Sequence, residues 1–167
     1  MKMSDGVEWG IHCASVLSQL DADATMPGKA LAEFHGVSES YLLKHLKALT
    51  AAGLLESVPG PHGGYRLART PEKITLLDIV LAVDGSEPAF RCSEIRRRGP
   101  AAMPDKSYRT PCGINSAMLR AERAWRAELK ATTLADTIKE YACVVQVWAQ
   151  NRTAQWVKQN QRPSANA

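Results

Sequence analysis

Two pairs of side chains in this sequence belong to residue types that bind metal ions. Glu8 and His12 are four residues apart in an apolar pattern, so a helix would place both on one face. A carboxylate and an imidazole at this spacing can share a metal ion. Cys92 and Cys112 stand at the two ends of an irregular, arginine-rich segment, which a bound ion could hold together. The plainer readings are a solvated surface pair and two unrelated loop thiols.

The other two cysteines give no such signal. Cys13 lies on the apolar row of the first predicted helix, and Cys143 lies between Ala142 and Val144 in the last one. Both are predicted to be small buried hydrophobic residues. The sequence contains no nucleophile–base arrangement, phosphate-binding loop or substrate-pocket signature, so an enzyme acting on a small-molecule substrate is not expected.

The composition is that of an ordinary globular protein with room for one compact domain and an appendage. The chain has 167 residues, of which 45% are hydrophobic and 23% charged. No apolar run approaches the roughly 20 residues that a membrane span needs. The start, MKMSDGVEW, lacks the apolar core of a signal peptide, which predicts a cytoplasmic protein. Cysteines in that compartment are expected to be thiols or ligands rather than structural disulfides.

The metal-ligating residues flank a segment with the layout of a winged helix-turn-helix. From Ala30, a short apolar helix runs into His35-Gly36-Val37, and Ser38 then begins a second helix that stops at Gly53. Two short strands, 54–58 and 65–68, are joined by a glycine-rich turn. Such a module places its second helix in the DNA major groove. The fold class is therefore predicted as mainly α with a small β-hairpin wing.

Two parts of this module supply candidate DNA contacts. Short polar side chains can contact bases or phosphates, cations neutralise phosphates, and glycines let a backbone approach the duplex. The candidates on the second helix are Ser38, Ser40, Tyr41, Lys44, His45 and Lys47, and those in the wing are His62, Gly63, Gly64 and Arg66. The plainer alternative is a helical hairpin with a solvated basic face.

Net charge alone gives weak support for DNA binding. The total is +4, but residues 1–83 hold 7 Lys+Arg against 9 Asp+Glu, whereas residues 84–131 hold 10 against 6. The positive charge of the predicted DNA-binding half must therefore be local, at Lys44 and Lys47 and at Arg66 and Arg69 after the glycine turn.

Helical periodicity organises the rest of the chain. Helices are predicted at 7–20, 76–83, 114–129 and, as one further region, 133–159, with an irregular segment at 85–113. The predicted divisions are a DNA-binding domain at 1–83, a cluster-binding loop at 84–113, dimerisation helices at 114–160 and a disordered tail at 161–167. The two long helices appear without a core of their own, so we expect a two-fold homodimer.

Three motifs carry a resemblance to a known family. The wing contains Gly-Gly-Tyr-Arg-Leu at 63–67, the next helix opens with Ile-Thr-Leu-Leu-Asp-Ile at 74–79, and Thr-Leu-Ala-Asp follows at 133–136. Over about residues 7–150 the chain resembles the Rrf-type winged-helix regulators, although Pro59 stands where that family often has an arginine. The resemblance implies a transcriptional regulator, most readily a repressor, that binds a roughly palindromic DNA operator.

The resemblance also implies a cofactor. Redox- or nitric-oxide-sensing members hold an iron–sulfur cluster with three cysteines in a compact loop, whereas this chain has two cysteines with nineteen residues between them. A redox-responsive branch of the family uses two cysteines, a glutamate and a histidine for a [2Fe–2S] cluster. Glu8, His12, Cys92 and Cys112 match that set, with the first two from one subunit and the cysteines from the other. The redox state of the cluster would then switch DNA affinity.

Other uses of the same residues stay open at this point. Two thiolates, an imidazole and a carboxylate also suit tetrahedral zinc, and Cys92 with Cys112 could form a thiol–disulfide switch. Trp9 lies between Glu8 and His12 in the sequence. We expect Trp9 to relay a change at the metal-ligating residues to the predicted recognition helix, the alternative being an ordinary core tryptophan.

Overall fold

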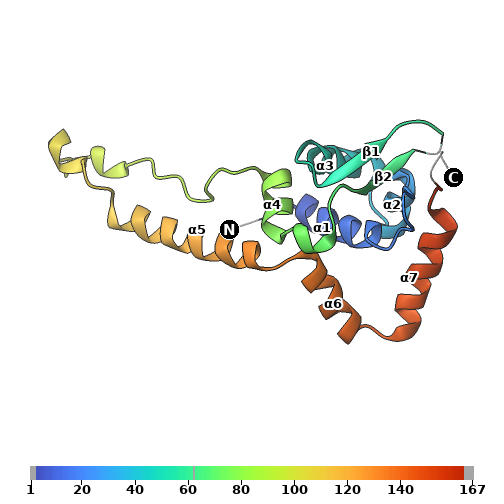
Figure 1. Cartoon of the computed structure of the whole chain (residues 1–167). Coiled ribbons are helices and arrows are strands. Elements are labelled where there is room, and N and C mark those ends of the chain that lie inside the picture. The colour runs from blue at the N-terminus through green and yellow to red at the C-terminus, as the bar shows by residue number, and fades with distance from the viewer. Residues whose placement is uncertain (1–2, 62, 164–167) are drawn as a thin grey trace.

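The computed structural model describes residues 3–61 and 63–163, which form a winged helix-turn-helix body with a long projecting arm (Figure 1). The predicted fold class is confirmed, since the described residues are mainly helical with one antiparallel hairpin. The body contains α1 (Asp5–Leu17), α2 (Gly28–His35), α3 (Glu39–Ala51), β1 (Leu55–Val58), β2 (Gly64–Leu67) and α4 (Leu76–Asp84). The remaining helices are α5 (Gly113–Ala131), α6 (Leu134–Val144) and α7 (Val147–Asn160). No helix in the described part of the chain is both long and apolar enough to cross a membrane.

Local sequence signals set the ends of these helices. Gly36 adopts a left-handed conformation (φ 65°) that ends α2 and turns the chain into α3. Thr75 with Asp78 and Thr133 with Asp136 form capping boxes that begin α4 and α6. In each box the threonine hydroxyl accepts a backbone N–H while the aspartate accepts the threonine N–H.

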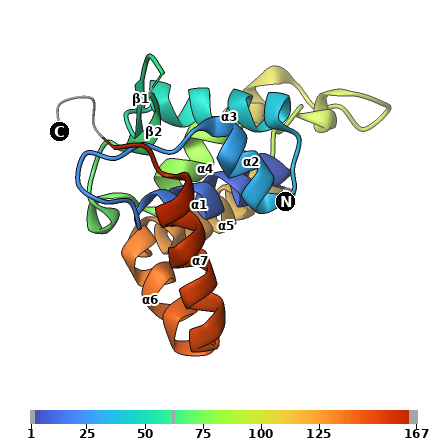
Figure 2. The ribbon, with the colours of Figure 1, turned by 90° about the vertical axis from the view of Figure 1, so that its right-hand side faces the viewer.

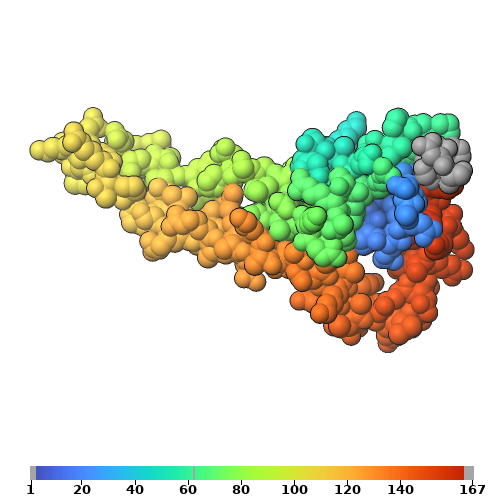
Figure 3. All heavy atoms as spheres, viewed as in Figure 1, coloured from blue at the N-terminus to red at the C-terminus, as the bar shows by residue number. Residues whose placement is uncertain are grey.

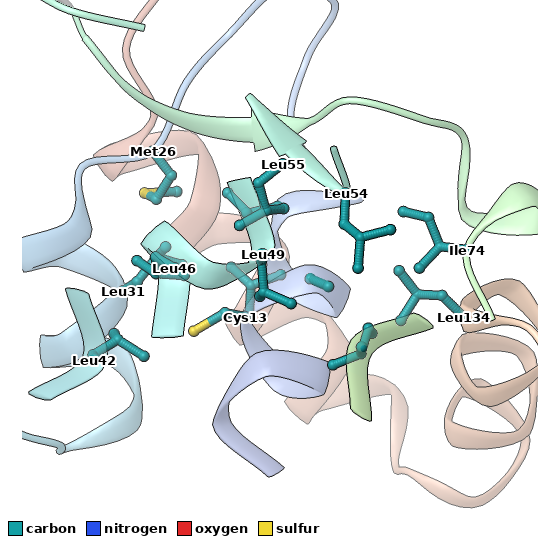
Figure 4. Packing of buried hydrophobic residues seen from close by; sticks show 14 of the residues in the cluster. Cys13, Met26, Leu31, Leu42, Leu46, Leu49, Leu54, Leu55, Ile74 and Leu134 are labelled. Carbon is teal, nitrogen blue, oxygen red and sulfur yellow. The ribbon is translucent and has the colours of Figure 1, made fainter. Parts of the chain in front are cut away.

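The hydrophobic core lies where α1, α2, α3 and the hairpin meet (Figure 4). Leu42, Leu46 and Leu49 line the inner face of α3 at helical spacing, and each is at most 1% exposed. Met26 is fully buried, and its backbone N–H and C=O pair with Tyr65 of β2. This pairing ties the wing to the segment before α2.

The helices α6 and α7, which lie within the predicted dimerisation region, pack on the body of the same chain. Leu134 is fully buried beside Ile74, and its N–H donates to the Ile74 carbonyl at 2.8 Å. In α7, Val157 is 1% exposed, and the Trp156 ring lies 4.7 Å from that of Phe34. In Figure 2, α6 and α7 form a hairpin at the end of the molecule opposite the wing. These two helices therefore find a core without a second copy.

The single helical region predicted at 133–159 is wrong, because the chain breaks into α6 and α7 at Val145 and Gln146. Both residues have extended backbone angles. The Gln150 side-chain amide donates to the carbonyls of Ala142 and Val145, at 2.9 and 2.8 Å, and so satisfies the end of α6. The break is stabilised by a contact that helical periodicity does not reveal.

The predicted disordered tail at 161–167 also begins too early. Arg162 and Thr25 exchange two backbone hydrogen bonds, and the Gln161 side chain accepts the Asp21 N–H at 3.0 Å. Lys158 forms an ion pair with Asp21 at 2.6 Å. The end of α7 is therefore joined to the turn before α2, while residues 164–167 of the predicted tail lie outside the described residues.

The arm consists of the irregular segment 85–112 and α5, which project away from the body (Figure 3). Two short 3-10 turns, Ile95–Arg97 and Asp105–Tyr108, are the only regular structure that the described part of this segment contains. Along α5, Ile114 and Met118 are 68% and 42% exposed. Uncovered apolar side chains that a second copy could bury therefore occur on α5, and α6 and α7 carry others, namely Tyr141, Val144, Val147 and Trp148.

Candidate DNA-binding surface and metal-ligating residues

The outer face of α3 presents five of the six predicted contacts of that helix. Ser38, Ser40, Tyr41, Lys44 and Lys47 are all exposed, and their side chains face away from the leucine row of the core. Ser38 occupies the N-cap position, but its hydroxyl bonds to the Ser40 hydroxyl at 3.1 Å instead of capping the helix. Among the described residues, Lys44 and Lys47 have no carboxylate partner, so both ammonium groups are free to meet phosphates.

His45 is the exception, and its prediction as a DNA contact is corrected. Its side chain points inward from α3, and the residue is only 5% exposed. Its ring packs edge-on against Tyr41 at 4.8 Å and Trp9 at 6.1 Å. Burial, with a smaller effect from Lys44, lowers the pKa of His45 below the usual value, which favours the neutral ring. His45 therefore connects α3 to α1 and does not reach the surface.

The wing glycines are required by the hairpin itself. A Cβ at Gly63 would lie 2.1 Å from the Val58 carbonyl oxygen, and one at Gly64 would lie 2.5 Å from that of Met26. Both positions thus exclude a side chain because protein backbone occupies the space. His62, also predicted as a contact, lies outside the described residues.

Arg66 is held by carboxylates in this structure. Its guanidinium pairs with Glu56 at 2.9 Å and with Asp23 at 3.2 Å, and its side chain is 31% exposed. The hydrogen bond that Arg66 Nε donates to the Glu56 carboxylate is the main cause that raises the pKa of Arg66. A contact between Arg66 and DNA would require exchange of these surface pairs, which are individually weak.

Glu8 and His12 lie one turn apart on α1, and both side chains are exposed. The His12 ring lies 5.8 Å from the ring of His35 at the end of α2. The two side chains thus form a two-donor face on the body that is open to a further group.

The two arm cysteines offer the matching donors. Cys92 is exposed, and Cys112 is half-buried at the N-cap of α5. Backbone N–H groups of Asn115 and Ile114 hydrogen-bond to the Cys112 thiol, and these bonds, with a smaller effect from Arg96, lower its pKa. A thiol in this position readily becomes the thiolate that a metal binds.

The residues between these cysteines form a small ordered cluster. Arg96 pairs with Glu94 at 2.5 Å, and Arg97 pairs with Asp105 at 2.7 Å. Both guanidinium groups lie over the Tyr108 ring, at 5.4 and 4.8 Å from its centre. The Tyr108 hydroxyl donates to the Arg96 carbonyl at 2.8 Å and accepts the Met103 N–H at 2.7 Å. The tip of the arm is therefore built from its own side chains.

One copy of the chain does not assemble the predicted ligand set. In residues 3–61 and 63–163, no group of three or more His, Cys, Asp or Glu side chains is placed to hold a metal ion. Glu8 and His12 belong to the body, while both cysteines belong to the arm (Figure 1). The donor types themselves fit an iron–sulfur cluster, because thiolate, imidazole and carboxylate are all ligands of iron.

The other two cysteines differ from each other. Cys13 is fully buried, and burial raises its pKa to about 12, as expected for a core thiol. Cys143 is exposed on α6, so its predicted burial is wrong. Because α6 packs on the body through Leu134, its opposite face, which carries Cys143, meets solvent.

A polar anchor at the base of the arm was missed from the sequence. Glu122 is 9% exposed, and its carboxylate accepts hydrogen bonds from Arg126 Nε at 2.7 Å, Trp125 Nε1 at 3.1 Å and the Ala89 N–H at 3.4 Å. Arg126 also donates to the Ser86 carbonyl at 2.9 Å. The spacing of Glu122 and Arg126 signals a helical ion pair, but it does not reveal the fixed segment before Cys92.

Comparison with known proteins relates this chain to a family of transcriptional regulators. The sequence profile of the Rrf2 family, described as iron-dependent transcriptional regulators, matches residues 3–140. YffB of Lactococcus lactis, whose name assigns it to the HTH-type transcriptional regulators, is 33% identical over 140 residues, covering 84% of this chain and 88% of YffB. The regulator IscR of Aliivibrio salmonicida is 40% identical over 70 residues, or 42% of each chain.

Two solved structures share the fold. CymR (YrzC), the global cysteine regulator of B. subtilis, superposes with a TM-score of 0.64 and 25% identity, covering 84% of this chain and 98% of CymR. IscR of T. potens gives a TM-score of 0.63 and 26% identity, covering 90% of this chain and 96% of IscR. The profile match ends at residue 140, within α6, so the whole of α7 lies beyond it.

Proposed function

This chain belongs to the Rrf2 family of transcriptional regulators, and we propose that it is a homodimeric, sequence-specific repressor whose DNA affinity depends on the redox state of a [2Fe–2S] cluster. DNA binding is supported by the exposed face of α3, where Ser40, Tyr41, Lys44 and Lys47 lie together. The relatives are regulators and not enzymes. Because two copies of such a module read two half-sites, the operator is expected to be roughly palindromic.

The observation that carries the cofactor proposal is the division of donors between body and arm. Glu8 and His12 form an exposed pair on α1, and two accessible thiols lie on a segment that projects from the body. A second copy can bring its arm to this pair, so that each site takes Glu8 and His12 from one protomer and Cys92 and Cys112 from the other. When bound, a [2Fe–2S] cluster supplies a centre that accepts and releases one electron.

The surrounding residues have definable tasks in this arrangement. Glu8 and His12 would bind one iron and the two cysteines the other. One ring nitrogen of His12 would be a ligand, and the second can hold a proton. Arg96, which lies close enough to influence Cys112, favours additional negative charge at that end of the site.

A redox titration of the protein isolated without oxygen tests this function. Visible absorption and electron paramagnetic resonance are followed while retention of a selected DNA duplex is measured in parallel. We expect one-electron reduction to change the spectrum and the DNA affinity together. Cys92→Ser should abolish the absorption, and Cys143→Ser, which alters another exposed thiol, should retain it. Absorption unchanged in Cys92→Ser would contradict the ligand set.

A second candidate is a thiol-based or zinc-dependent regulator of the same fold. The likeness to CymR, whose title names it a cysteine regulator, and the lowered pKa of Cys112 favour thiol chemistry. A zinc protein would be colourless, and a Cys92–Cys112 disulfide switch would leave regulation intact in His12→Ala. The same titration separates these cases from the cluster.

A further inference from the structure

The excess positive charge of this chain lies in the loop of the arm and not in its winged-helix body. Residues 90–110 hold six Lys+Arg against two Asp+Glu, whereas residues 1–83 hold two more acidic than basic residues. A DNA-binding protein gains most of its non-specific affinity from cations near phosphates. The body alone is therefore poorly charged for a duplex that extends beyond α3.

Arg91, the first of the six cations of the loop, pairs with Glu87 at 3.6 Å, and the other five divide into two groups. Arg96 and Arg97 are engaged by Glu94, Asp105 and the Tyr108 ring, and so build the tip of the arm.

The second group has no such role. Arg98, Lys106 and Arg109 are exposed, and within the part of the chain that the structure describes none of their side chains forms an ion pair or hydrogen bond. Because Arg96 and Arg97 order the tip of the arm, these three charges lie on an ordered surface and not on a flexible segment.

The loop also faces the correct side of the molecule. In Figure 1, the loop runs along the same upper side as α3 and the wing, with α5 beneath it. Figure 2, turned by 90°, again places the loop at the height of α3 and the wing, with the α6–α7 hairpin at the opposite end. A duplex lying on α3 and the wing and running along the arm would face the loop that carries Arg98, Lys106 and Arg109.

We propose that the basic loop of the arm is a second DNA-contacting surface, which binds backbone phosphates beyond the half-site read by α3. Arg98, Lys106 and Arg109 supply the contacts, through charge and without reading sequence. The inference rests on the DNA-binding part of the proposed function and does not depend on the cofactor.

The salt dependence of DNA affinity tests this surface. Affinity is measured over a series of salt concentrations, on a duplex selected by the wild-type protein and long enough to cover both half-sites and the sequence between them. A plot of log K against log salt has a negative slope, and each lost phosphate contact should make this slope less steep by about 0.9. We therefore expect Arg98→Gln/Arg109→Gln to reduce the slope by about two for each protomer engaged.

A matched variant controls for net charge. Lys139→Gln/Arg152→Gln also removes two positive charges, from α6 and the N-terminal half of α7, on the side away from α3. This variant should keep the wild-type slope. Phosphate-ethylation interference gives a second readout. Ethylation of phosphates between the half-sites should weaken binding of the wild-type protein but should not weaken binding of Arg98→Gln/Arg109→Gln.

Three results would overturn the proposal. The arm variant and the control variant could show the same slope. The arm variant could lose dimers in sedimentation while its slope stays unchanged, which would make the loop a protein-binding surface. The arm variant could also lose thermal stability and DNA affinity together while its phosphate-ethylation interference pattern stays unchanged. The lost affinity would then come from a less stable fold and not from lost phosphate contacts. Lys44→Gln keeps the test separate from the proposed function, because an unchanged slope in that variant would refute DNA reading by α3 itself.

Discussion

Gly6 of α1 lies directly against the imidazole ring of His45 in α3. A Cβ at position 6 would lie 2.3 Å from Cε1 and 2.5 Å from Nδ1 of that ring. The two helices therefore meet with no space for even one methyl group. Glu8 and His12 share α1 with Gly6, and Lys44 shares α3 with His45. A displacement of α1, which carries the proposed ligands, must accordingly displace α3, which carries the proposed DNA contacts.

Gly6→Ala tests how tight this contact is. The added methyl group must displace the His45 ring, and overpacking of this kind costs about 1–3 kcal/mol. We expect a lower free energy of unfolding in urea and weaker DNA binding, because α3 is held away from its native position. Gly113→Ala is the control, since nothing lies within 4 Å of a Cβ there. Equal stability of the two variants would show that α1 and α3 can separate freely.

His45 should make the protein sensitive to acid. Burial lowers its pKa in the folded state, so the unfolded chain binds the proton more readily. The contribution of the neutral His45 ring to the free energy of unfolding is fully present above the pKa of histidine in the unfolded chain, about 6.5. This contribution is lost as the pH falls below that pKa. His35, whose pKa is lowered by burial and by His12, acts in the same direction.

We therefore expect the free energy of unfolding of metal-free protein to fall between about pH 7.5 and pH 5.5, where carboxylates stay largely ionised. His45→Leu keeps an apolar group in the same space and should weaken, but not abolish, this dependence, because His35 remains. Urea denaturation at the two pH values measures it. A pH dependence in His45→Leu as steep as that of the wild type would exclude His45 as its source.

Trp9 is placed to carry a change at α1 to α3. Its ring lies edge-on to Tyr41 at 5.2 Å and close to His45 at 6.1 Å. We expect Trp9→Ala to retain the visible absorption of the cluster but to bind DNA equally in both redox states. Trp148→Ala, which removes a tryptophan that is 58% exposed, should behave as the wild type. Undiminished redox dependence in Trp9→Ala would reduce Trp9 to an ordinary packing residue.

Lys44 and Lys47 should act through phosphates. Replacing either by glutamine should weaken binding to all sequences alike and lower the salt slope by about one. Filter retention of selected and random duplexes over a salt series measures both effects. Retention of random and selected duplex to the same extent by the wild type, at moderate salt, would count against a sequence-reading role.

Much of the body follows from the sequence because local signals and helical spacing agree. The leucines of α3 recur every three or four residues between a serine and a glycine, which defines the helix and its buried face. The inward direction of His45 could not be read in this way. It depends on Gly6, thirty-nine residues earlier, which leaves room for the ring.

The remaining differences have the same cause. The pairing of Arg66 with Asp23 joins residues 43 positions apart, and the break between α6 and α7 depends on a side chain that reaches back to Ala142. Periodicity describes one element at a time, whereas these contacts arise only when elements pack. The donors Glu8 and His12 were predictable as a pair because they share one helix.

Exchange of ligands between subunits is the claim on which the account of function depends most. One variant, Glu8→Ala/His12→Ala, lacks the α1 donors, and a second, Cys92→Ser/Cys112→Ser, lacks the arm donors. Neither variant should bind a cluster as a homodimer. A mixed dimer of the two, however, contains one complete site, made from the intact α1 of one protomer and the intact arm of the other.

The decisive measurement is the cluster content of that mixed dimer, isolated through a different affinity tag on each variant. The account predicts visible absorption and iron at half the wild-type level per dimer, with neither signal in the two homodimers. A mixed dimer as colourless as its parents, while the wild type carries a cluster, would show that the ligands do not come from two protomers and would contradict the account.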